Sequence, residues 1–347
     1  MSKICILGDT HFGVQNDSPF FLNYSIDYFN NVFFPYLREN NIKTVIHMGD
    51  VFDRRRFINM NTLNKINNNF LKPFYDSEFE LHCILGNHDV YYKNTNKVNS
   101  LNELLNKNII HIYEEPTCKN IQGFDVGFVP WITQDNAENC LEFIENKSCN
   151  ILFGHFEMRS FEMSRGIKNI EGICPSLFKD YNVVFSGHFH CRQTQENIYY
   201  VGTPYQLNFS DINELKGFHI FDLETRNLEF IENKNKIFKE IKYDDQKENM
   251  LNLSFEQYEN CFVKVVVQMK AQPYMFERFM ENLNNSNTAG VTVIEESFFE
   301  LSNEELEDQS QDTLSIINRE IDMMEDGLDK NKLKQMIHDL YVESLSI

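Results

Sequence analysis

Short apolar runs alternate with amphipathic stretches through the first two-thirds of the chain, and several of these runs end at a glycine. Such runs are typical of strands that are covered on both faces of a sheet. The predicted strands are Ile4–Leu7, Thr44–Met48, Leu81–Leu85, Asp125–Val129, Asn150–Phe153, Val183–Ser186 and Tyr199–Val201. The predicted helices are Asn23–Glu39, Met60–Leu71, Leu101–Leu105 and Glu138–Glu145. This alternation predicts an α/β core in residues 1–225, with its first helix kinked or shortened at Pro35.

The pattern changes after about residue 225. A predicted strand, Phe262–Met269, is followed by a helix that opens on a proline, Pro273–Asn285, and then by a second strand, Val291–Glu295. This β-α-β unit predicts a small accessory domain within residues 226–300.

Residues 301–347 are acidic, with twelve Asp and Glu against four Lys and Arg, and Ser302–Asp312 is expected to be a solvated linker. Two amphipathic helices are predicted after it. Their apolar stripes are Leu314, Ile317, Ile321, Met324 and Leu328, then Leu333, Met336, Ile337, Leu340 and Tyr341. These helices could cap the core of this chain or dock in a groove of a partner, and the acidic linker favours the partner.

The net charge is −20, from 52 acidic and 32 basic residues. Proteins that hold DNA unaided usually present a basic face, so this balance argues against strong DNA affinity without a local basic strip or a partner. The eight cysteines are scattered and are expected to be buried free thiols of a reducing compartment. With no signal peptide and no apolar run of about 18 residues, we expect a soluble protein inside the cell.

Five short polar motifs stand directly after predicted strands. They are Gly8-Asp9-Thr10-His11, Gly49-Asp50-Val51-Phe52-Asp53, Gly86-Asn87-His88-Asp89, Gly154-His155 and Gly187-His188-Phe189-His190. Ligands of open α/β sheets collect outside the carboxyl ends of the strands, so the motifs are expected to meet at one rim. Their donors are oxygen and nitrogen without thiolate, which suits two divalent ions such as Mn²⁺ or Fe²⁺ better than a structural zinc. Two such ions, with Asp50 as the bridging carboxylate, can clamp and polarise a phosphoryl group.

In this order, the motifs D-x-H, G-D-x-x-D, G-N-H-D, G-H and G-H-x-H make residues 1–225 resemble the calcineurin-like metallophosphoesterases. The resemblance implies a β-sandwich flanked by helices. It places one ion on Asp9, His11, Asp50 and His190, and the other on Asp50, Asn87, His155 and His188. It makes His88 a catalytic histidine outside the ligand set, which stabilises the transition state or protonates the leaving oxygen. Asp89, or alternatively Asp53, would orient a catalytic histidine.

Within that superfamily the sequence is most similar to the nuclease subunit of SbcC–SbcD type complexes, in the short form of T-even-like phages. The similarity lies in His47–Asp53, Gly86–Asn94, Val129–Trp131 and Tyr200–Pro204. It implies a Mn²⁺-dependent exonuclease and endonuclease for DNA, with Mg²⁺ also able to serve. It also implies a DNA-binding α/β capping domain in residues 226–300, a homodimer, and docking of residues 301–347 on the coiled coil of an ABC-type ATPase. The location would be the cytoplasm, that of the host for a phage protein.

Two groups beside the motifs have open interpretations. Arg54, Arg55 and Arg56 would either bind DNA phosphates at the rim or make ion pairs at a helix start. Tyr91, Tyr92 and Lys93 would either stack on bases and touch phosphate or pack against the first helix. Two other functions stay open as well. They are a phosphatase for a small or protein substrate, and a structural regulator of the ATPase with a vestigial site.

Overall fold

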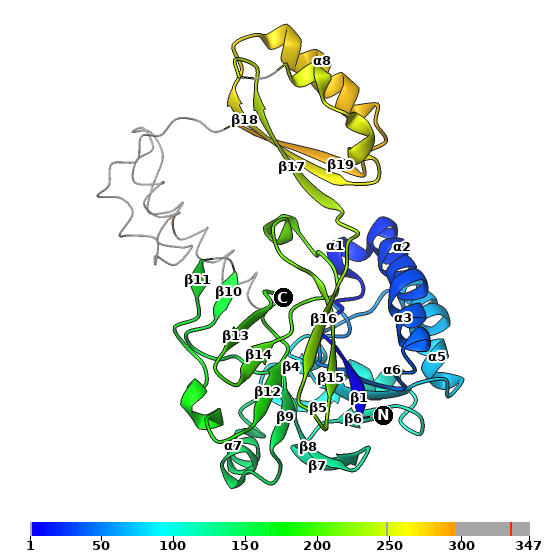
Figure 1. Ribbon diagram of the computed structural model, residues 1–347, viewed down its shortest axis with the longest axis vertical. Helices are drawn as coiled ribbons and strands as arrows, with labels where there is room; N and C mark the ends of the chain where they lie inside the picture. The colour runs from blue at the N-terminus through cyan, green and yellow to red at the C-terminus, as the bar shows by residue number, and fades with distance from the viewer. Residues whose placement is uncertain (1, 165, 248, 296–333, 335–347) are drawn as a thin grey trace. The chain divides into compact units, whose positions relative to one another are not determined.

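The computed structural model describes residues 2–164, 166–247, 249–295 and 334 (Figure 1). The chain divides into two units, residues 1–295 and 296–347. The first unit contains all the described residues except Lys334. The predicted linker, the two C-terminal helices and their docking on a partner otherwise lie outside the described residues.

A six-stranded mixed sheet forms one half of the core. Its order is β16 (Leu228–Glu232), β15 (Gly217–Asp222), β1 (Lys3–Leu7), β2 (Thr44–His47), β3 (Glu80–Ile84) and β6 (His111–Tyr113). Strands β1, β2, β3 and β6 run parallel, whereas β15 and β16 add an antiparallel edge. The carboxyl ends of β1, β2 and β3 therefore lie side by side.

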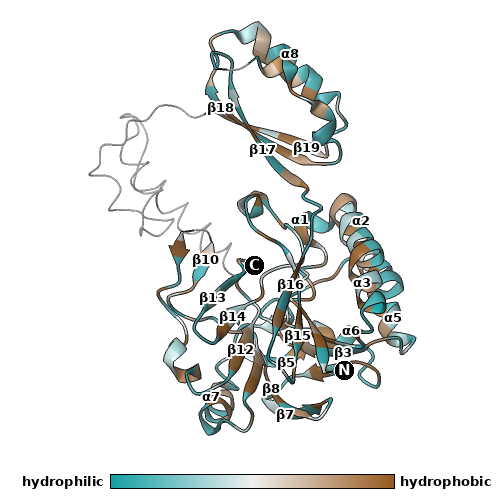
Figure 2. Ribbon diagram, in the orientation of Figure 1, coloured by the Kyte–Doolittle hydropathy of each residue, from teal (hydrophilic) through white to brown (hydrophobic). Residues whose placement is uncertain are grey.

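A second six-stranded sheet forms the other half. Its order is β13 (Gln193–Gln195), β14 (Ile198–Tyr200), β12 (Val183–Ser186), β9 (Ile151–Gly154), β8 (Phe124–Val129) and β7 (Thr117–Ile121). Strands β8, β9, β12 and β14 are parallel. Apolar side chains of both sheets, such as Ile6 and Ile46 from the first and Phe153 and Phe185 from the second, share one buried cluster. The two sheets therefore form the expected β-sandwich, and β8 and β12 are coloured mostly as hydrophobic in Figure 2.

Helices cover the outer face of the first sheet. The first helical stretch consists of α2 (Pro19–Tyr28), a π-helical turn (Phe29–Phe33) and α3 (Phe34–Glu39), and the second of α4 (Met60–Ile66), a π-helical turn (Asn67–Leu71) and α5 (Lys72–Tyr75). The π-helical turns end two residues before Pro35 and Pro73, whose rings cannot join a regular α-helical hydrogen-bond ladder. Pro35 therefore does not end its helix, because a wide turn accommodates it. The abundant phenylalanines pack between these helices and the sheet, with Phe29 and Phe70 rings 4.6 Å apart.

Shorter elements complete the core. Helix α7 (Ala137–Asn146) and a 3₁₀ turn (Pro175–Phe178) pack on the outer face of the second sheet. Other short elements are the turn α1 (Val14–Asp17), helix α6 (Ser100–Leu104), a 3₁₀ turn (Phe209–Asp211), and the hairpins β4 (Val90–Tyr92) with β5 (Thr95–Asn99) and β10 (Glu162–Ser164) with β11 (Ile167–Lys168). None of the helices in the described part of the chain has the length and apolarity to span a bilayer.

The accessory segment is a three-stranded parallel sheet with one helix. It contains β17 (Phe238–Asp244), β18 (Phe262–Met269), β19 (Gly290–Glu295) and α8 (Pro273–Asn284). Strand β17 was not predicted. Because β16 pairs with β15, the core sheet extends to Glu232, past the expected boundary at residue 225. At the junction, Phe21 of α2 stacks on Phe262 with ring centroids 5.3 Å apart.

All eight cysteines are free, as expected. The prediction that they are buried was wrong for Cys118 and Cys174, which are exposed, and for Cys191, which is partly exposed. Cys118 lies on β7, an edge strand of the second sheet, where one face of the strand meets solvent.

Candidate metal centre

The five motif loops meet at one rim of the sandwich. Three follow β1, β2 and β3 of one sheet, and two follow β9 and β12 of the other. Three motif residues adopt the left-handed backbone conformation, with φ of 44° at His11, 51° at Asp50 and 83° at His188. Such conformations in non-glycine residues cost free energy and concentrate at functional sites. A Cβ on Gly86 would collide with the backbone and carboxylate of Asp50, which explains the glycine there.

One cluster joins the first and last motifs. Asp9, His11 and His190 each present a ligand-type atom within a 4.8 Å group. The Nε2 atoms of His11 and His190 face each other at 3.1 Å. The buried Oδ1 of Asp9 has no hydrogen-bond partner in the described part of the chain, whereas its Oδ2 accepts from the backbone N–H of His188. A buried carboxylate oxygen directed at two imidazoles is the donor set that a divalent ion requires.

A second cluster joins the middle motifs. Asp50, His155 and His188 form another group of convergent ligand-type atoms. The Oδ1 of Asn87 completes it, 2.9 Å from His188 Nδ1 and 3.0 Å from His155 Nε2. The other nitrogen of His155, Nδ1, lies 2.8 Å from the carbonyl oxygen of Met48 and donates to it. That hydrogen bond fixes the ring so that Nε2 faces the cluster.

Asp50 stands between the two clusters. Its Oδ2 lies 3.4 Å from His155 Nε2 in one cluster and 3.7 Å from His11 Nε2 in the other. Its Oδ1 accepts the backbone N–H of His88 at 2.7 Å. One oxygen is thus anchored to the protein and the other is shared, which is the geometry of a bridging carboxylate.

Protonation in the centre follows from its buried charges. Burial lowers the pKa of His155, but the carboxylates of Asp50 and Asp9 raise it to about 9. Burial alone would raise the pKa of Asp50, yet His155 and His11 hold it well below its usual value. Burial raises the pKa of Asp9 to about 7. A cation that binds here therefore competes with a proton on His155.

The two histidines of the last motif, His188 and His190, can coordinate a metal ion without first losing a proton. Burial, reinforced by His155, lowers the pKa of His188 to about 3. Burial, reinforced by His11, lowers the pKa of His190 to about 3. Neutral imidazoles are the form that ligates metals, so the residues of both clusters fit divalent ions.

His88 lies beside the clusters and not within the second. Its Nδ1 donates to the carbonyl oxygen of Asp53 at 2.5 Å, and its ring meets that of His11 edge-on with centroids 4.8 Å apart. Burial lowers its pKa, so it is neutral in the free protein at neutral pH. The Nδ1 hydrogen bond leaves Nε2 as the atom available to a ligand.

Asp89 and Asp53, the two candidates for orienting a catalytic histidine, make different contacts. The carboxylate of Asp89 accepts three backbone N–H groups, from Gly86, Asp50 and Val51, and holds two motif loops together. Among the described residues, no histidine side chain forms a hydrogen bond or ion pair with this carboxylate. Asp53 does contact histidines, because its carbonyl accepts from His88 and its carboxylate Oδ1 lies 3.4 Å from His11 Nδ1.

Sequence reasoning missed a buried ion cluster behind His190. Lys216 is only 3% exposed and donates from Nζ to the His190 carbonyl at 2.9 Å, while pairing with Asp211 at 2.7 Å and Glu214 at 2.6 Å. Lys216 therefore fixes the backbone of a candidate ligand. Nothing in the sequence around this lysine signals that contact across 26 positions.

We expect Lys216→Met to weaken the first cluster. Losing the cation leaves two buried carboxylates unpaired, which typically costs about 3–5 kcal/mol of unfolding free energy. Loss of such a supporting contact typically weakens metal binding about 10–100-fold. Thermal denaturation and Mn²⁺ titration calorimetry measure the two effects. The exposed Lys179→Met is the control, and unchanged Mn²⁺ affinity in folded Lys216→Met would contradict the role.

The three arginines differ in their surroundings. Arg54 contacts Asn16 and lies 3.8 Å from Asp17, as the local ion-pair interpretation expects. Arg55 is half-buried, and burial lowers its pKa while the charge of Asp50 opposes that shift, so the two side chains interact electrostatically. Arg56 is exposed, with its guanidinium 6.0 Å from the Tyr91 ring.

The hairpin after His88 carries exposed aromatic and basic side chains. Tyr91 is 39% and Tyr92 51% exposed, and Lys93 is exposed too. The two tyrosine rings meet each other edge-on at 4.7 Å. This exposure favours the interpretation that the tyrosines are open to a ligand over the alternative that they pack against the first helix.

An apolar hollow of about 640 Å³ adjoins the centre. It is lined by Trp131, Ile132, Leu141, Ile173, Leu177 and the candidate ligand His155, among others. The Trp131 ring lies 5.0 Å from that of His188. The Trp131 carbonyl accepts from Asn96 and Asn136, which fixes its backbone. In the sequence, Trp131 stood out only because Val129–Trp131 is one of the segments similar to the SbcD-type nucleases, and no role was predicted for its side chain.

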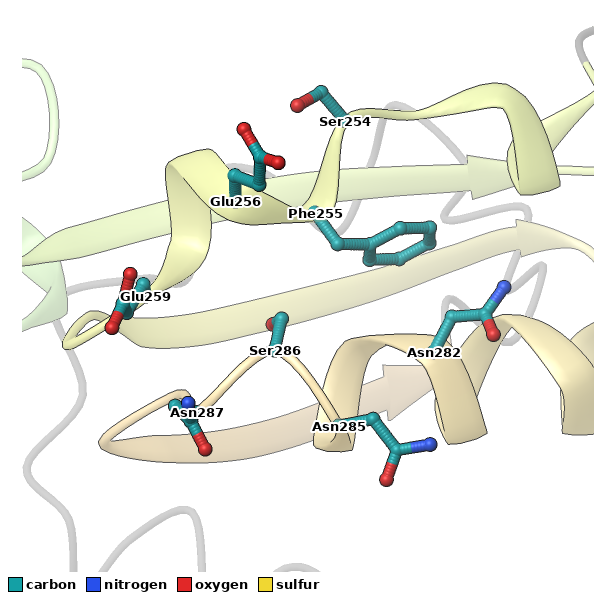
Figure 3. Close-up of a pocket in the computed structure, with 8 residues that line it drawn as sticks. All are labelled: Ser254, Phe255, Glu256, Glu259, Asn282, Asn285, Ser286 and Asn287. Atoms are coloured by element: carbon teal, nitrogen blue, oxygen red, sulfur yellow. The ribbon is translucent and has the colours of Figure 1, made fainter.

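Another hollow, of about 530 Å³, lies in the accessory segment (Figure 3). Glu256 and Glu259 line it together with uncharged residues such as Asn282 and Ser286. Without a basic side chain in its lining, it does not suit a nucleic-acid phosphate.

Comparison with known proteins agrees with this geometry. The sequence profile of the calcineurin-like phosphoesterases matches residues 2–192. The chain belongs to this family and is a phosphoesterase, and the family uses divalent metals.

Two curated relatives of this chain are named as subunits of nucleases. The chain is 33% identical to exonuclease subunit 1 of Enterobacteria phage T4 over 346 residues, 99% of each chain. It is 30% identical to the SbcD component of the SbcCD nuclease of Staphylococcus epidermidis over 106 residues, 27% of this chain and 28% of that protein. A solved archaeal phosphodiesterase is 16% identical over 67% of this chain and 99% of its own, with a TM-score of 0.31, too low to carry an argument.

Proposed function

We propose that this chain is a DNA nuclease that hydrolyses phosphodiester bonds with two divalent ions, most favourably Mn²⁺. The observation that carries the proposal is the position of Asp50 Oδ2 between two clusters of ligand-type atoms, with His88 beside them. The names of both curated relatives support the choice of nucleic acid as substrate.

Each ion has its own residues in this proposal. Asp9, His11, Asp50 and His190 would hold one ion, and Asp50, Asn87, His155 and His188 the other. When bound, such ions polarise the phosphoryl oxygens and lower the pKa of water to supply the nucleophile. The protein keeps the pair rigid through Asp89, which ties the second and third motif loops together by their backbone N–H groups.

His88 handles the proton of the leaving group. The free protein holds it neutral, and an anionic phosphodiester beside it raises its pKa so that it takes up a proton. The Asp53 carbonyl stabilises the resulting imidazolium through Nδ1–H, and Nε2–H points to the departing 3′ oxygen.

The substrate surface would extend from His88 along the exposed hairpin. Arg56 and Lys93 supply positive charge there, and Tyr91 supplies an aromatic face. Arg55 interacts electrostatically with Asp50 and would contact the scissile phosphate. These few cations do not offset a net charge of −20, so we propose that an ABC-type ATPase partner contributes DNA affinity and control.

Partner contacts follow the same proposal. The acidic segment 301–347 would dock on the ATPase, and a homodimer contact would use the exposed Phe57 and Met60 at the start of α4. The site of action is the cytoplasm. The accessory segment would help to bind DNA through surfaces other than the hollow of Figure 3.

One assay tests the function. The purified full chain with Mn²⁺ is given linear double-stranded and single-stranded DNA, a p-nitrophenyl diester and a p-nitrophenyl monoester, with and without the ATPase. We expect cleavage of DNA and of the diester. Activity on the monoester alone would identify a phosphatase, and no hydrolysis in any combination would identify a structural regulator.

We expect Trp131 to hold a nucleobase next to the scissile phosphate. Stacking of a base on an aromatic ring contributes about 1–3 kcal/mol, so Trp131→Ala should raise KM for single-stranded DNA about 5–150-fold. Trp131→Phe should retain most of the affinity. An abasic nucleotide at the scissile position should raise the KM of the wild type by the same factor. It should leave the KM of Trp131→Ala unchanged, because that variant has already lost the stacking contact. Equal losses from the abasic nucleotide in both proteins would refute this role.

A further inference from the structure

A histidine and carboxylate cluster lies on β3 and β6, at the end of β3 opposite the metal centre. Glu80 and His82 are on β3, and His111 begins β6. Their ligand-type atoms all lie within 4.8 Å of one another. His82 and Asn87 are separated by five positions along an extended chain, so roughly 15 Å lies between this cluster and the candidate phosphoesterase site.

Strand geometry brings these three residues together. Glu80 and His82 are two positions apart, so both side chains point to the same face of the sheet. His111 is the registered partner of His82 on the parallel neighbouring strand. Their rings stack with centroids 4.6 Å apart and an angle of 21° between planes.

His82 is a fixed member of the cluster. It is fully buried, and its ring lies nearly parallel to those of Tyr113 and Phe128. Its Nδ1 is hydrogen-bonded to the Tyr113 hydroxyl at 2.7 Å. Its buried Nε2 points toward Glu80 but, among the described residues, has no aligned hydrogen-bond partner. The Glu80 carboxylate lies at ion-pair distance but is poorly aligned with this nitrogen, which would gain a better partner if an ion bound between them.

The other two members can adjust. The side chain of Glu80 is 47% exposed and that of His111 is 41% exposed. Glu80 Oε1 lies 3.2 Å from His82 Nε2 and 3.3 Å from His111 Nε2. Glu80 Oε2 accepts from the Thr44 hydroxyl at 3.4 Å, which leaves Oε1 directed at both rings.

The separations of both histidine Nε2 atoms from Glu80 Oε1 match those between two ligands of one metal ion. With bonds of about 2.0–2.1 Å, two ligands of a tetrahedral zinc ion lie about 3.3 Å apart. We propose that Glu80, His82 and His111 form an additional site for Zn²⁺ or a similar late transition-metal ion, separate from the phosphoesterase centre. The three protein ligands leave one position for water on the exposed side.

The site has a structural role in this proposal. It ties the first residue of β3 to the edge strand β6, and β3 ends just before Asn87 and His88. Bound metal would therefore stabilise the strand that delivers two residues of the catalytic motif. An ion that binds only the folded state raises the free energy of unfolding, and with it the unfolding temperature, with the logarithm of the ratio of its concentration to Kd.

The test measures how many zinc ions bind per full chain after a chelator has removed all bound metal. Equilibrium dialysis against micromolar Zn²⁺ is expected to give one more bound ion for the wild type than for His111→Asn or Glu80→Gln. Glu115→Gln removes an exposed carboxylate outside the cluster and should bind as the wild type does. His82 is left unchanged because its buried ring stacks on Tyr113 and Phe128, two residues of the core.

A second measurement isolates the new site from the catalytic one. In an Asp50→Ala background, Co²⁺ should give the visible absorption of a tetrahedral nitrogen and oxygen site, and His111→Asn should abolish it. His111→Asn alone should keep Mn²⁺-dependent hydrolysis of a phosphodiester within twofold of the wild type. Equal zinc counts for wild type, His111→Asn and Glu80→Gln would overturn the proposal, whatever the outcome of the nuclease assay.

Discussion

Asp50→Ala is expected to remove both ions and nearly all phosphodiester hydrolysis. The shared Oδ2 lies within 3.7 Å of a histidine in each cluster, so one substitution takes a ligand from both. Lewis-acid stabilisation by bound ions amounts to several kcal/mol, and each 1.4 kcal/mol or so is a factor of ten. We therefore expect a loss of on the order of 10⁴-fold in kcat/KM. Titration calorimetry with Mn²⁺ should show binding to neither cluster at micromolar concentration.

Two further variants make the Asp50 result specific. Asp50→Asn keeps an oxygen that can accept the His88 N–H but loses the negative charge, so it should retain the fold and bind Mn²⁺ weakly. Asp180→Ala, which removes an exposed carboxylate outside the motifs, should behave as the wild type. If Asp50→Ala bound one Mn²⁺ with the affinity of the wild type, the bridging position would be wrong.

The motif loops were predictable because their information is local. A strand that ends in a glycine followed by Asp, Asn or His gives both the turn and the ligand, and parallel neighbours bring those turns to one rim. The prediction of five such turns needed no knowledge of side-chain packing. Gly86 shows why the pattern is strict, because a side chain there would occupy the place of Asp50.

Contacts between distant segments could not be predicted in this way. Lys216 reaches the carbonyl of His190 from a loop that has no motif, and a buried lysine is exceptional. The backbone contacts of Asp89 were unpredictable for the same reason, since two of them are with N–H groups on another motif loop. Every residue except proline has a backbone N–H group, so the residue types do not indicate which of these groups will donate to a carboxylate.

Several strands were not predicted, and two of them, β16 and β17, are lined by polar residues. Strand β15 was missed although it is apolar and buried. Strand β17 contains Lys239, Glu240 and Lys242, and only its Ile241 and Tyr243 side chains join the core of the accessory segment. Strand β16 alternates in a similar way at the edge of the first sheet. Both are half-exposed strands, which lack the continuous apolar runs that marked the central ones.

His88 gives the other large effect, and its substitution separates catalysis from metal binding. We expect His88→Gln to bind two Mn²⁺ ions with unchanged affinity, because its ring lies outside both ligand sets and its backbone N–H to Asp50 remains. A positioned general acid contributes about 10²–10⁴-fold, so kcat for DNA should fall by that factor. Calorimetry and single-turnover cleavage of a labelled strand measure the two quantities.

The leaving group distinguishes proton donation from other roles of His88. A p-nitrophenolate departs as a stable anion and needs no proton, so His88→Gln should hydrolyse methyl p-nitrophenyl phosphate nearly as fast as the wild type does. A 3′ alkoxide needs the proton, so the loss should appear only with DNA. The wild-type kcat for DNA should also decline above the pKa that His88 has in the substrate complex, and this decline should vanish in the variant. Equal losses on both substrates would mean that His88 acts by binding the phosphate, since a phosphate contact serves either leaving group.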